Sequence, residues 1–342
     1  MSKNQHFING EWVDSISGAT RTITCPANGE FVAEVAEGGK EDVEKAILAA
    51  REAFESGVWS GVAASKRGDF LIKVAEEIER RKDEFARAEA LDTGKRLVEA
   101  EGDMDDIANC FRYYGKIADS NPGRIVDAGD PTVLSRVAYE PMGGCGMLTP
   151  WNFPRLQASG KLAPALATGN SFVIKPSELT PSTTLLIADV LDSLGLPAGV
   201  ANVVMGDGAN VGSVLSSHPE IDLISFTGGL ETGKKIAESA AQGVKKVALE
   251  LGGKNPNIVF ADADFDAAVD NALNAGFLDS GLVCSAGTRL IVEESIAEKF
   301  VDELVRRAEG IVMGGPFDEK AETGPLISKQ HRDKVTSYVE RG

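Results

Sequence analysis

The sequence predicts an α/β fold with a largely parallel sheet, followed by a second and smaller α/β region. From residue 143 onward, short apolar segments alternate with helical patterns, as the crossovers of a parallel sheet require. Only about two strand segments follow residue 252, too few for an independent α/β domain. The 342 residues are enough for two domains, so the second is either small or C-terminally incomplete.

The segments after residue 143 are short and regularly spaced. Strands are predicted over 144–149, 171–175, 201–205, 221–227, 245–251, 257–260 and 288–293. Helices are predicted over 155–167, 182–194, 209–217, 232–242, 263–276 and 295–310. Most of these helices fall between two strands, which favours βαβ units.

The first 140 residues have a different pattern. Residues 7–37 alternate short β-like segments with turns, and Asn9-Gly10 is a hairpin signal. Apolar residues recurring at helical spacing predict helices over 41–56, 66–92 and about 103–119. The turn signal Asn121-Pro122-Gly123 opens the segment 120–140, which predicts an arm or hairpin outside the core.

Composition excludes several classes of protein. Hydrophobic residues make up 43% of the chain, so a large core is expected. Lys plus Arg is 35 and Asp plus Glu is 52, and the net charge of −17 argues against nucleic-acid or anionic-membrane partners. No apolar segment is long enough for a membrane span or a signal peptide. The four cysteines are scattered, which predicts no metal site and favours the reducing cytoplasm.

A cysteine among small residues is the first candidate for chemistry. Cys284 lies between Gly281 and Gly287, after a helical pattern and before a strand-like segment. The small neighbours leave room for a ligand at the sulfur, so Cys284 is a candidate nucleophile. A free cysteine is more often a buried small hydrophobic side chain, and this stretch alone favours that plainer interpretation.

Two further motifs follow predicted strands, where α/β proteins bind ligands. Residues 221–235 form the pattern strand, Gly228-Gly229 turn, helix, which presents backbone N–H groups to a phosphate. Lys175 and Glu178 follow another strand, and an ammonium and a carboxylate there suit ribose hydroxyls. An ordinary tight turn and a solvent-exposed loop explain these two motifs about equally well.

Two more motifs hold polar groups at strand ends. Asn152 lies between Pro150 and Pro154, and an amide fixed in this way can donate to an oxyanion. Glu250 precedes paired glycines and is an available general base for water. Glu250 also lies about 20 residues after the glycine turn, the place of a ribose-binding acid in a Rossmann motif. The residues alone leave both roles of Glu250 open, and leave a purely structural turn open for Asn152.

Together and in this order, the motifs resemble the NAD(P)-dependent aldehyde dehydrogenase superfamily. The resemblance extends over essentially the whole chain. The matching segments are Pro150-Trp151-Asn152-Phe153-Pro154, Lys175-Pro176-Ser177-Glu178, Phe226-Thr227-Gly228-Gly229, Glu231-Thr232-Gly233, Leu249-Glu250-Leu251-Gly252-Gly253-Lys254, and Gly281 with Val283-Cys284. Within the superfamily, 103–109 and 250–258 are most similar to betaine aldehyde dehydrogenases.

The resemblance implies the aldehyde dehydrogenase fold and a domain division. A Rossmann-like NAD-binding domain would comprise 1–122 and 141–251, and 123–140 would be a partial oligomerisation arm. The α/β catalytic domain would be 252–342 and C-terminally incomplete. We expect a homo-oligomer where the missing C-terminal part is present.

The resemblance also implies oxidation of an aldehyde to a carboxylic acid with NAD. Cys284 would attack the aldehyde, the Asn152 amide and the Cys284 backbone N–H would stabilise the oxyanion, and Glu250 would activate water for thioester hydrolysis. Glu178 favours NAD over NADP because a carboxylate repels a 2′-phosphate. The residues assigned to the cofactor are Trp151, Lys175, Glu178, Gly228, Gly229 and Leu251, and those assigned to the substrate pocket are Phe153, Leu156 and Gly160.

Three departures from betaine aldehyde dehydrogenases bear on the substrate. Gly160 stands where these enzymes usually have a tryptophan that helps to bind trimethylammonium. Arg155 replaces a leucine, and we expect it to add a charge near the substrate entrance. Leu282 replaces a glutamine two residues before the cysteine. We therefore expect a bulkier or anionic aldehyde to be preferred over betaine aldehyde.

The C-terminal end opens an alternative function. Family members continue beyond this point with a Glu-x-x-Phe-Gly-Pro motif, whose acid binds the nicotinamide ribose, and with an oligomerisation strand. An incomplete, catalytically inactive NAD-binding fragment is therefore the alternative to an active dehydrogenase. A CoA-acylating relative is a third hypothesis, which Glu250 disfavours.

Overall fold

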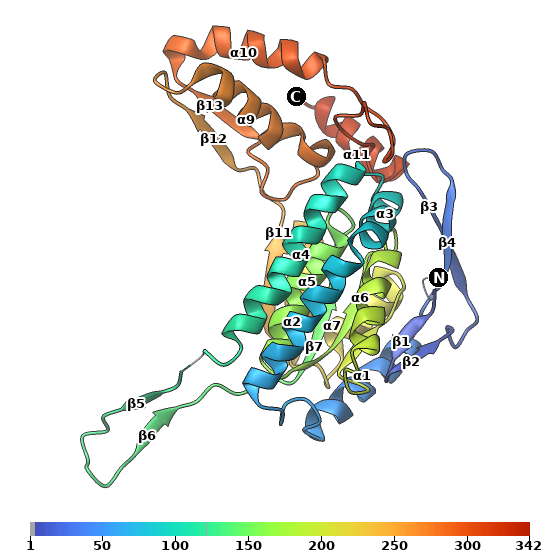
Figure 1. The fold of residues 1–342 in the computed structure, drawn as a ribbon, viewed down its shortest axis with the longest axis vertical. Helices are drawn as coiled ribbons and strands as arrows, with labels where there is room; N and C mark the ends of the chain where they lie inside the picture. The colour runs from blue at the N-terminus through green and yellow to red at the C-terminus, as the bar shows by residue number, and fades with distance from the viewer. Residues whose placement is uncertain (1–3, 121) are drawn as a thin grey trace.

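The computed structural model describes residues 4–120 and 122–342. The first three residues of the predicted segment 1–122, and Asn121 of the predicted turn, lie outside the described residues. A large body surrounds the main sheet, a smaller body lies at one end of it, and a thin arm projects from the other end (Figure 1).

The main sheet is mixed, with a parallel centre. In spatial order its seven strands are β11 (Lys246–Leu251), β10 (Leu223–Gly228), β7 (Gly144–Leu148), β8 (Ser171–Lys175), β9 (Ala201–Val203), β1 (His6–Ile8) and β2 (Glu11–Val13). The strands β7 to β11 are parallel, and β1 and β2 add antiparallel pairs at one edge. The predicted α/β fold with a largely parallel sheet is therefore confirmed.

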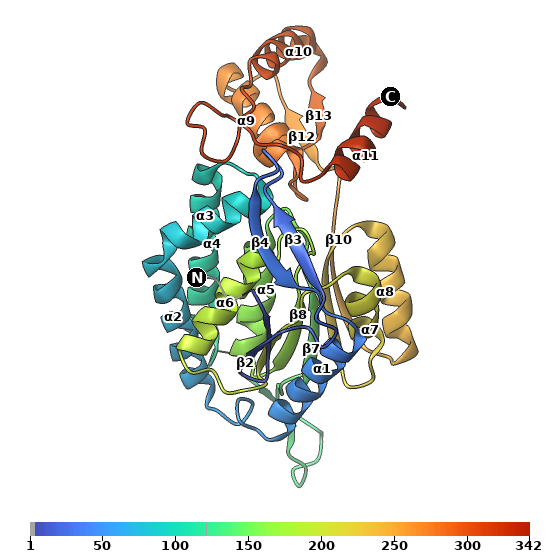
Figure 2. The same ribbon diagram turned by 90° about the vertical axis from the view of Figure 1, so that its right-hand side faces the viewer.

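Helices cover both faces of this sheet (Figure 2). One face carries α2 (Ala64–Arg80), α3 (Lys82–Thr93), α4 (Leu97–Ile117), α5 (Pro154–Ala167) and α6 (Ser182–Ser193). The other carries α1 (Lys40–Glu55), α7 (Ser213–Ser217) after a π-helical turn (Gly208–Gly212), and α8 (Leu230–Gln242). All five residues of the central strand β8 are buried, as expected for a parallel strand covered on both sides.

Two predicted helices differ from the observed ones. The segment predicted as one helix over 66–92 is divided at Arg81, whose φ of −103° and ψ of 19° leave the helical region. The helix predicted to begin at about 103 begins at Leu97, because the Glu99 carboxylate accepts a hydrogen bond from the Arg96 N–H at 3.2 Å. Neither the division at Arg81 nor the start of α4 at Leu97 occurs at a proline or a glycine. The sequence therefore carries no strong signal for either of them.

The smaller body is built on two parallel strands, β12 (Pro256–Val259) and β13 (Arg289–Val292). The helices α9 (Phe265–Phe277) and α10 (Glu294–Glu309) pack on it around a cluster formed by Val259, Val269, Ala272 and Phe300. The last helix is α11 (Lys329–Val339). The boundaries proposed for the domains stay a prediction, although the main sheet ends at Leu251 and the smaller sheet starts at Pro256.

Two hairpins lie outside these sheets. The first, β3 (Thr20–Thr24) with β4 (Phe31–Ala36), runs along one side of the large body (Figure 1). The second, β5 (Arg124–Val126) with β6 (Ser135–Val137), forms the projecting arm within the predicted segment 123–140. Within the described part of the chain, none of the helices combines the length and apolarity needed to cross a membrane.

Candidate active site

The predicted site residues lie where the order of the parallel strands reverses. From β7 the chain proceeds outward through β8 and β9, and then returns to place β10 and β11 on the other side of β7. Ligands of open α/β sheets bind beyond the carboxyl ends of the strands at such a reversal. Here β7 leads directly to Trp151 and Asn152, and β10 ends at the Gly228-Gly229 turn.

The Cys284 loop lies against this position and is held from both bodies. Asn152, from the large body, donates its amide N–H to the carbonyl oxygen of Leu282 at 2.6 Å. Asn255, before β12, donates to the carbonyl oxygen of Cys284 at 3.4 Å. The structure therefore brings together Cys284 and Asn152, which are far apart in the sequence. Cys284 itself is exposed, so the plainer interpretation of a buried cysteine is wrong.

Glu250 lies at the exposed edge of the main sheet, shortly before a turn that approaches the Cys284 loop. It is the second-to-last residue of β11 and pairs with Thr227 of β10. Three residues further on, a side chain built on Gly253 would meet the Cys284 carbonyl oxygen at 3.6 Å, so this turn contacts the loop. Lys161, which the sequence analysis missed, donates to the Thr227 hydroxyl at 2.7 Å.

Lys161 is a buried cation near Glu250. Burial lowers its pKa to about 8, and the negative charge of Glu250 acts in the opposite direction. A lysine inside an apolar helical pattern is a weak signal, because most lysines there point to solvent. Only the pairing of β10 with β11 places this one beside the predicted general base.

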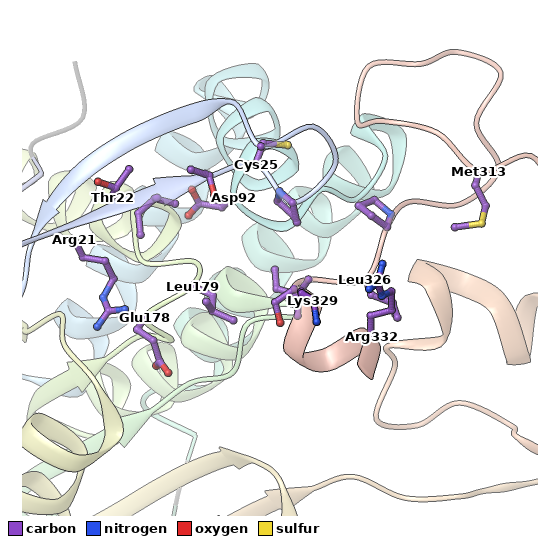
Figure 3. Close-up of a pocket in the computed structure, with 17 residues that line it drawn as sticks. Arg21, Thr22, Cys25, Asp92, Glu178, Leu179, Met313, Leu326, Lys329 and Arg332 are labelled. Atoms are coloured by element: carbon purple, nitrogen blue, oxygen red, sulfur yellow. The ribbon is translucent and has the colours of Figure 1, made fainter. Parts of the chain in front are cut away.

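The Lys175 and Glu178 pair fits the ribose of a nucleotide. The Lys175 ammonium is buried and donates to the carbonyl oxygens of Pro176 at 2.7 Å and Gly206 at 2.8 Å. Burial lowers the pKa of Lys175, and Glu178, whose carboxylate oxygen lies 3.5 Å away, opposes this effect. Glu178 and Leu179 line a cavity of about 740 Å³ (Figure 3), so the carboxylate has room to accept from ligand hydroxyls.

The glycine turn after β10 fits a phosphate. Gly229 is the N-cap of α8, a helix of 13 residues whose first N–H groups face outward. A side chain built on Gly229 would meet nothing within 4 Å, so the space before the helix is open. Leu251, at the end of β11, packs against Gly233 in the first turns of the same helix. Gly229 therefore faces open space, whereas the space at Gly233 is filled by Leu251.

Trp151 meets a residue that the sequence analysis also missed. Its indole and the imidazole of His331 pack edge to face, with ring centroids 4.9 Å apart. His331 lies in the first turn of α11, which the Ser328 hydroxyl caps by accepting from the His331 N–H at 3.1 Å. Burial lowers the pKa of His331. A single histidine in a polar segment gave no signal of this contact.

The candidate substrate residues lie on or just before α5. The Phe153 ring lies under the ammonium of Lys95, with 3.9 Å between the nitrogen and the ring centroid. Leu156 packs against the main core. Gly160 is exposed, and a side chain built there would meet nothing within 4 Å. Open space therefore lies beside Gly160.

The expectation that Arg155 adds a charge near the substrate entrance is wrong. Arg155 is fully buried, and its guanidinium lies over the Phe85 ring at 4.4 Å. It donates to the carbonyl oxygens of Phe85 at 2.6 Å and Thr183 at 3.0 Å, and lies 3.8 Å from the carboxylate of Glu89. As the second residue of α5, Arg155 points away from the loop before the helix and into the helical layer. Its charge therefore lies inside the helical layer and not at the substrate entrance.

An unusual turn precedes Cys284. Asp279, Ser280 and Gly281 follow one another with φ of 48°, 56° and 74°. Left-handed backbone costs a residue other than glycine on the order of 1–3 kcal/mol and persists only where the surroundings hold it. The Ser280 hydroxyl donates to the carbonyl oxygen of Gly324 at 2.6 Å, and the Asp279 N–H donates to Glu99 at 3.3 Å.

Comparison with protein families and with known proteins agrees with this geometry. Residues 12–342 match the model of the aldehyde dehydrogenase family. Betaine aldehyde dehydrogenase of Bacillus subtilis (strain 168) is 54% identical over 336 residues, which cover 98% of this chain and 69% of that protein. The mitochondrial aldehyde dehydrogenase of Homo sapiens is 44% identical over 342 residues, which cover 99% and 66%. The chain thus spans about two thirds of the length of these relatives.

Solved structures show the same arrangement of the chain. A point mutant of betaine aldehyde dehydrogenase from Staphylococcus aureus, in complex with NAD⁺ and with a BME-modified cysteine, superposes with a TM-score of 0.98 at 50% identity, covering 99% of this chain and 69% of that one. The enzyme without this substitution, also in complex with NAD⁺, has a TM-score of 0.97 and covers 98% and 67%. The fold is that of aldehyde dehydrogenases, and the chain belongs to the aldehyde dehydrogenase family.

Proposed function

We propose that this protein oxidises an aldehyde to a carboxylic acid with NAD⁺. The observation that carries the proposal is the hydrogen bond from Asn152 to the carbonyl oxygen of Leu282, two residues before Cys284, at the strand reversal from which the Gly228-Gly229 turn also starts. Membership of the aldehyde dehydrogenase family supports the reaction, and the NAD⁺ held by the Staphylococcus aureus structures supports the cofactor.

The first chemical step belongs to Cys284. Its thiolate attacks the carbonyl carbon, a C–S bond forms, and the carbonyl oxygen becomes an oxyanion. The backbone N–H of Cys284 and the side-chain amide of Asn152 are the donors for this oxyanion. In the structure the Asn152 amide donates to the carbonyl oxygen of Leu282, so it must change partner when an aldehyde is bound. The same side chain thereby holds the loop before the reaction and stabilises charge during it.

Glu250 completes the reaction. NAD⁺, when bound, accepts the hydride that leaves the carbon attached to sulfur and so supplies the oxidising step. Glu250 then takes a proton from a water molecule, the water oxygen attacks the thioester carbon, and the C–S bond breaks to release the acid and the thiolate. Its exposed position at the end of β11 gives water access to the carboxylate.

The residues that would hold the cofactor come from four strand ends. Lys175 and Glu178 would bind the adenosine ribose, and the Gly228-Gly229 turn would lie at the pyrophosphate. Trp151 and Leu251 would cover the nicotinamide side. The carboxylate of Glu178 in the wall of the cavity favours NAD⁺ over NADP⁺, because it would repel a 2′-phosphate.

For the substrate, we propose a bulkier aldehyde than betaine aldehyde. The open space at Gly160 supports this preference. The anionic substrates considered from the sequence lose their basis, because Arg155 is buried and paired with Glu89. The values of kcat/KM for betaine aldehyde, long aliphatic aldehydes and acidic aldehydes, measured side by side, test the proposal. A clear lead for betaine aldehyde would overturn it.

A second candidate function is NAD⁺ binding without turnover. It is favoured by the exposure of β11 along most of its length. Formation of NADH from the aldehyde panel, by a preparation whose intact mass has been checked, decides between the candidates. NADH that disappears with Cys284→Ala supports the dehydrogenase. Calorimetric NAD⁺ binding without any NADH supports the second candidate.

We also propose a reducing cellular compartment and self-association for this protein. Four cysteines without disulfides among the described residues support a reducing compartment such as the cytoplasm. Exposed Ile125, Val126 and Leu134 on the β5–β6 arm support self-association. Light scattering over a range of concentrations tests the oligomeric state.

A further inference from the structure

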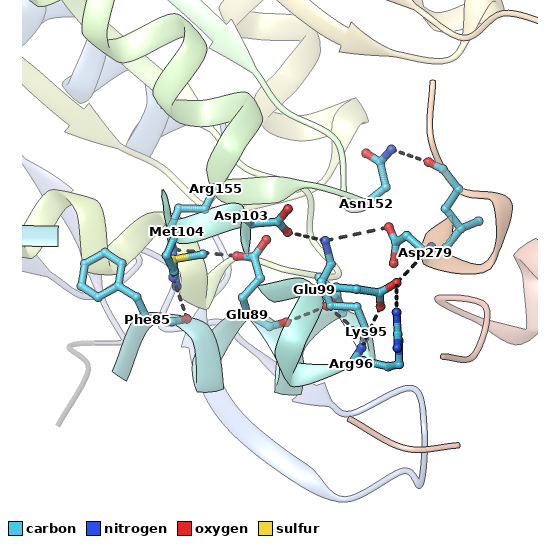
Figure 4. A network of polar contacts seen from close by, with 12 residues as sticks. Phe85, Glu89, Lys95, Arg96, Glu99, Asp103, Met104, Asn152, Arg155 and Asp279 are labelled. Atoms are coloured by element: carbon cyan, nitrogen blue, oxygen red, sulfur yellow. Dashed lines mark hydrogen bonds and ion pairs between the residues drawn. The ribbon is translucent and has the colours of Figure 1, made fainter. Parts of the chain in front are cut away.

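We propose that Lys95 is a positioning residue that ties the Cys284 loop to the substrate wall at Phe153 through Asp279. The proposal deepens the function proposed above and rests on it for its kinetic part. None of the sequence motifs pointed to Lys95. The structure places it between the two bodies, beside the candidate substrate wall at Phe153. On its other side, Lys95 faces Asp279 in the turn before the nucleophile (Figure 4).

Lys95 makes three contacts with one ammonium group. Its nitrogen lies 2.7 Å from a carboxylate oxygen of Asp103, 3.8 Å from one of Asp279, and 3.9 Å from the centroid of the Phe153 ring. The side chain is only 1% exposed. An ammonium without water in its surroundings needs such partners, so its position is fixed by all of them together.

The charges of this cluster are arranged around Lys95. Burial alone would lower the pKa of Lys95, but Asp279, Asp103 and Glu89 reverse this effect and raise it, so the ammonium stays protonated. Burial raises the pKa of Asp103, and raises that of Asp279 to about 6, with Lys95 acting against both shifts. The negative charge of Glu99 also raises the pKa of Asp279. One cation therefore faces several carboxylates.

The Asp279 contact acts on the backbone that leads to Cys284. Asp279 and Ser280 have left-handed backbone, and the Leu282 N–H donates to the carbonyl oxygen of Asp279 at 2.9 Å. The carbonyl oxygen of Leu282 in turn accepts from Asn152. Lys95, Asp279, Leu282 and Asn152 thus form a continuous path of contacts around the loop. Loss of the Lys95 charge leaves the carboxylate of Asp279 buried without a cation, and the turn then opens toward water.

If Lys95 had only a structural role, its replacement would loosen a different part of the protein. Its contact with Asp103 joins the turn before α4 to α4 itself, and this contact alone stabilises the helical layer. A residue with only that role would loosen α3 and α4 when it is replaced. A positioning residue would loosen 278–284 in particular and would depend on Asp279.

Hydrogen–deuterium exchange of the 342-residue chain separates these roles without relying on turnover. We expect Lys95→Met to raise exchange in 278–286 by about tenfold, while exchange in α9 and α10 stays within about twofold. Lys95→Arg keeps the charge and should restore most of the protection. In Lys95→Met/Asp279→Asn the buried carboxylate is gone, and exchange in 278–286 should return to within about threefold of the parent chain. Lys82→Met, which removes a surface ion pair with Asp105, is the matched control.

Kinetics add the second measurement. We expect Lys95→Met to lower kcat for aldehyde oxidation by about 10–100-fold, because a small displacement of the nucleophile is costly, and to leave the KM for NAD⁺ within about twofold. Unchanged exchange in 278–286, or a rise spread evenly over α3 and α4, overturns the proposal. If the parent chain forms no NADH, the proposed function fails while exchange still decides on Lys95. If Lys95→Met does not fold, Lys95→Gln replaces it in both the single and the double variant, and the single variant must raise exchange in 278–286 while the double variant restores protection.

Discussion

The two bodies of the molecule differ in how their strands are held. In the main sheet, the central strand β8 is buried along its whole length and packs between helical layers on both faces. In the smaller sheet, Val259 is the buried residue of β12, and all residues described in β13 are exposed or half-buried. The large body is therefore fixed by apolar packing over many residues, whereas the smaller one depends on a small cluster around Phe300.

This difference divides the candidate site. The cofactor residues follow strands of the large body, so packing of the sheet sets their positions. Cys284 belongs to a loop of the smaller body, and its place is set by polar contacts that cross to the large one, from Asn152, Lys95 and Glu99. We expect cofactor binding and nucleophile placement to respond separately to substitution.

The largest expected effect separates chemistry from binding. Cys284→Ala removes the nucleophile, and kcat should fall by about 10⁴-fold or more with the NAD⁺ dissociation constant unchanged. Glu178→Gln should raise the KM for NAD⁺ about tenfold, since it weakens a charge-assisted hydrogen bond to ribose. Steady-state kinetics and calorimetry measure both effects. A large loss of NAD⁺ affinity in Cys284→Ala would contradict the division.

The next effect compares the two cores directly. Phe172 and Phe300 are both fully buried, one in β8 and the other in α10. Replacement of either by alanine should cost about 3–5 kcal/mol of stability. Phe172→Ala should speed hydrogen exchange throughout the main sheet, and Phe300→Ala should speed it in the smaller body alone. Equal acceleration in β8 by both substitutions would show that the two bodies unfold as one.

A third prediction concerns the buried carboxylate of Glu89 in the large body. Burial raises its pKa from 4.5 to about 7, with Arg155 acting in the opposite direction. The folded state therefore binds more protons than the unfolded state between about pH 4.5 and 7, and stability must fall as pH rises through that window. Across this window, the titration of Glu89 lowers the free energy of unfolding by an amount on the order of 3 kcal/mol.

Replacement of Glu89 should flatten this pH dependence. Glu89→Gln removes the titrating group, so the fall in Tm between about pH 4.5 and 7 becomes shallower, whatever the stability at any one pH. Burial also raises the pKa of Asp279 to about 6, so part of the slope remains. Glu76→Gln, on the exposed face of α2, is the control and should leave the slope as it was. An identical slope in Glu89→Gln would show that Glu89 stays ionised.

Much of the fold followed from the sequence because its signals are local. The apolar segments of β7, β8 and β10 and the intervening helices could be located from periodicity alone, since buried parallel strands are nearly continuous apolar runs. The break at Arg81 could not, because it depends on how α2 and α3 pack around the core. Local preference favours a helix through this position.

The site was less predictable, because it depends on contacts between distant residues. Cys284, Asn152 and Glu250 stand out by their motifs, and their catalytic roles stay predictions. Lys95 and Asp279 are 184 positions apart and carry no motif, so nothing short of the fold brings them together. Arg155 lies beside a motif and was expected in the substrate entrance. Its place in the first turn of α5 turns it instead toward Glu89.

The smallest expected effect tests the open space at Gly160 in the large body. A side chain built there meets nothing within 4 Å, so Gly160→Trp should fold and should gain about 0.5–1 kcal/mol from removal of a glycine inside α5. The indole would add an aromatic face for a quaternary ammonium, worth about 1–2 kcal/mol, and kcat/KM for betaine aldehyde should rise about 5–30-fold. Gly160→Ala is the control, because it also removes the glycine from the helix but adds no ring. Equal kcat/KM values for the two variants would mean that the space at Gly160 lies outside the substrate path, and that the substrate wall is limited to the residues beside Lys95.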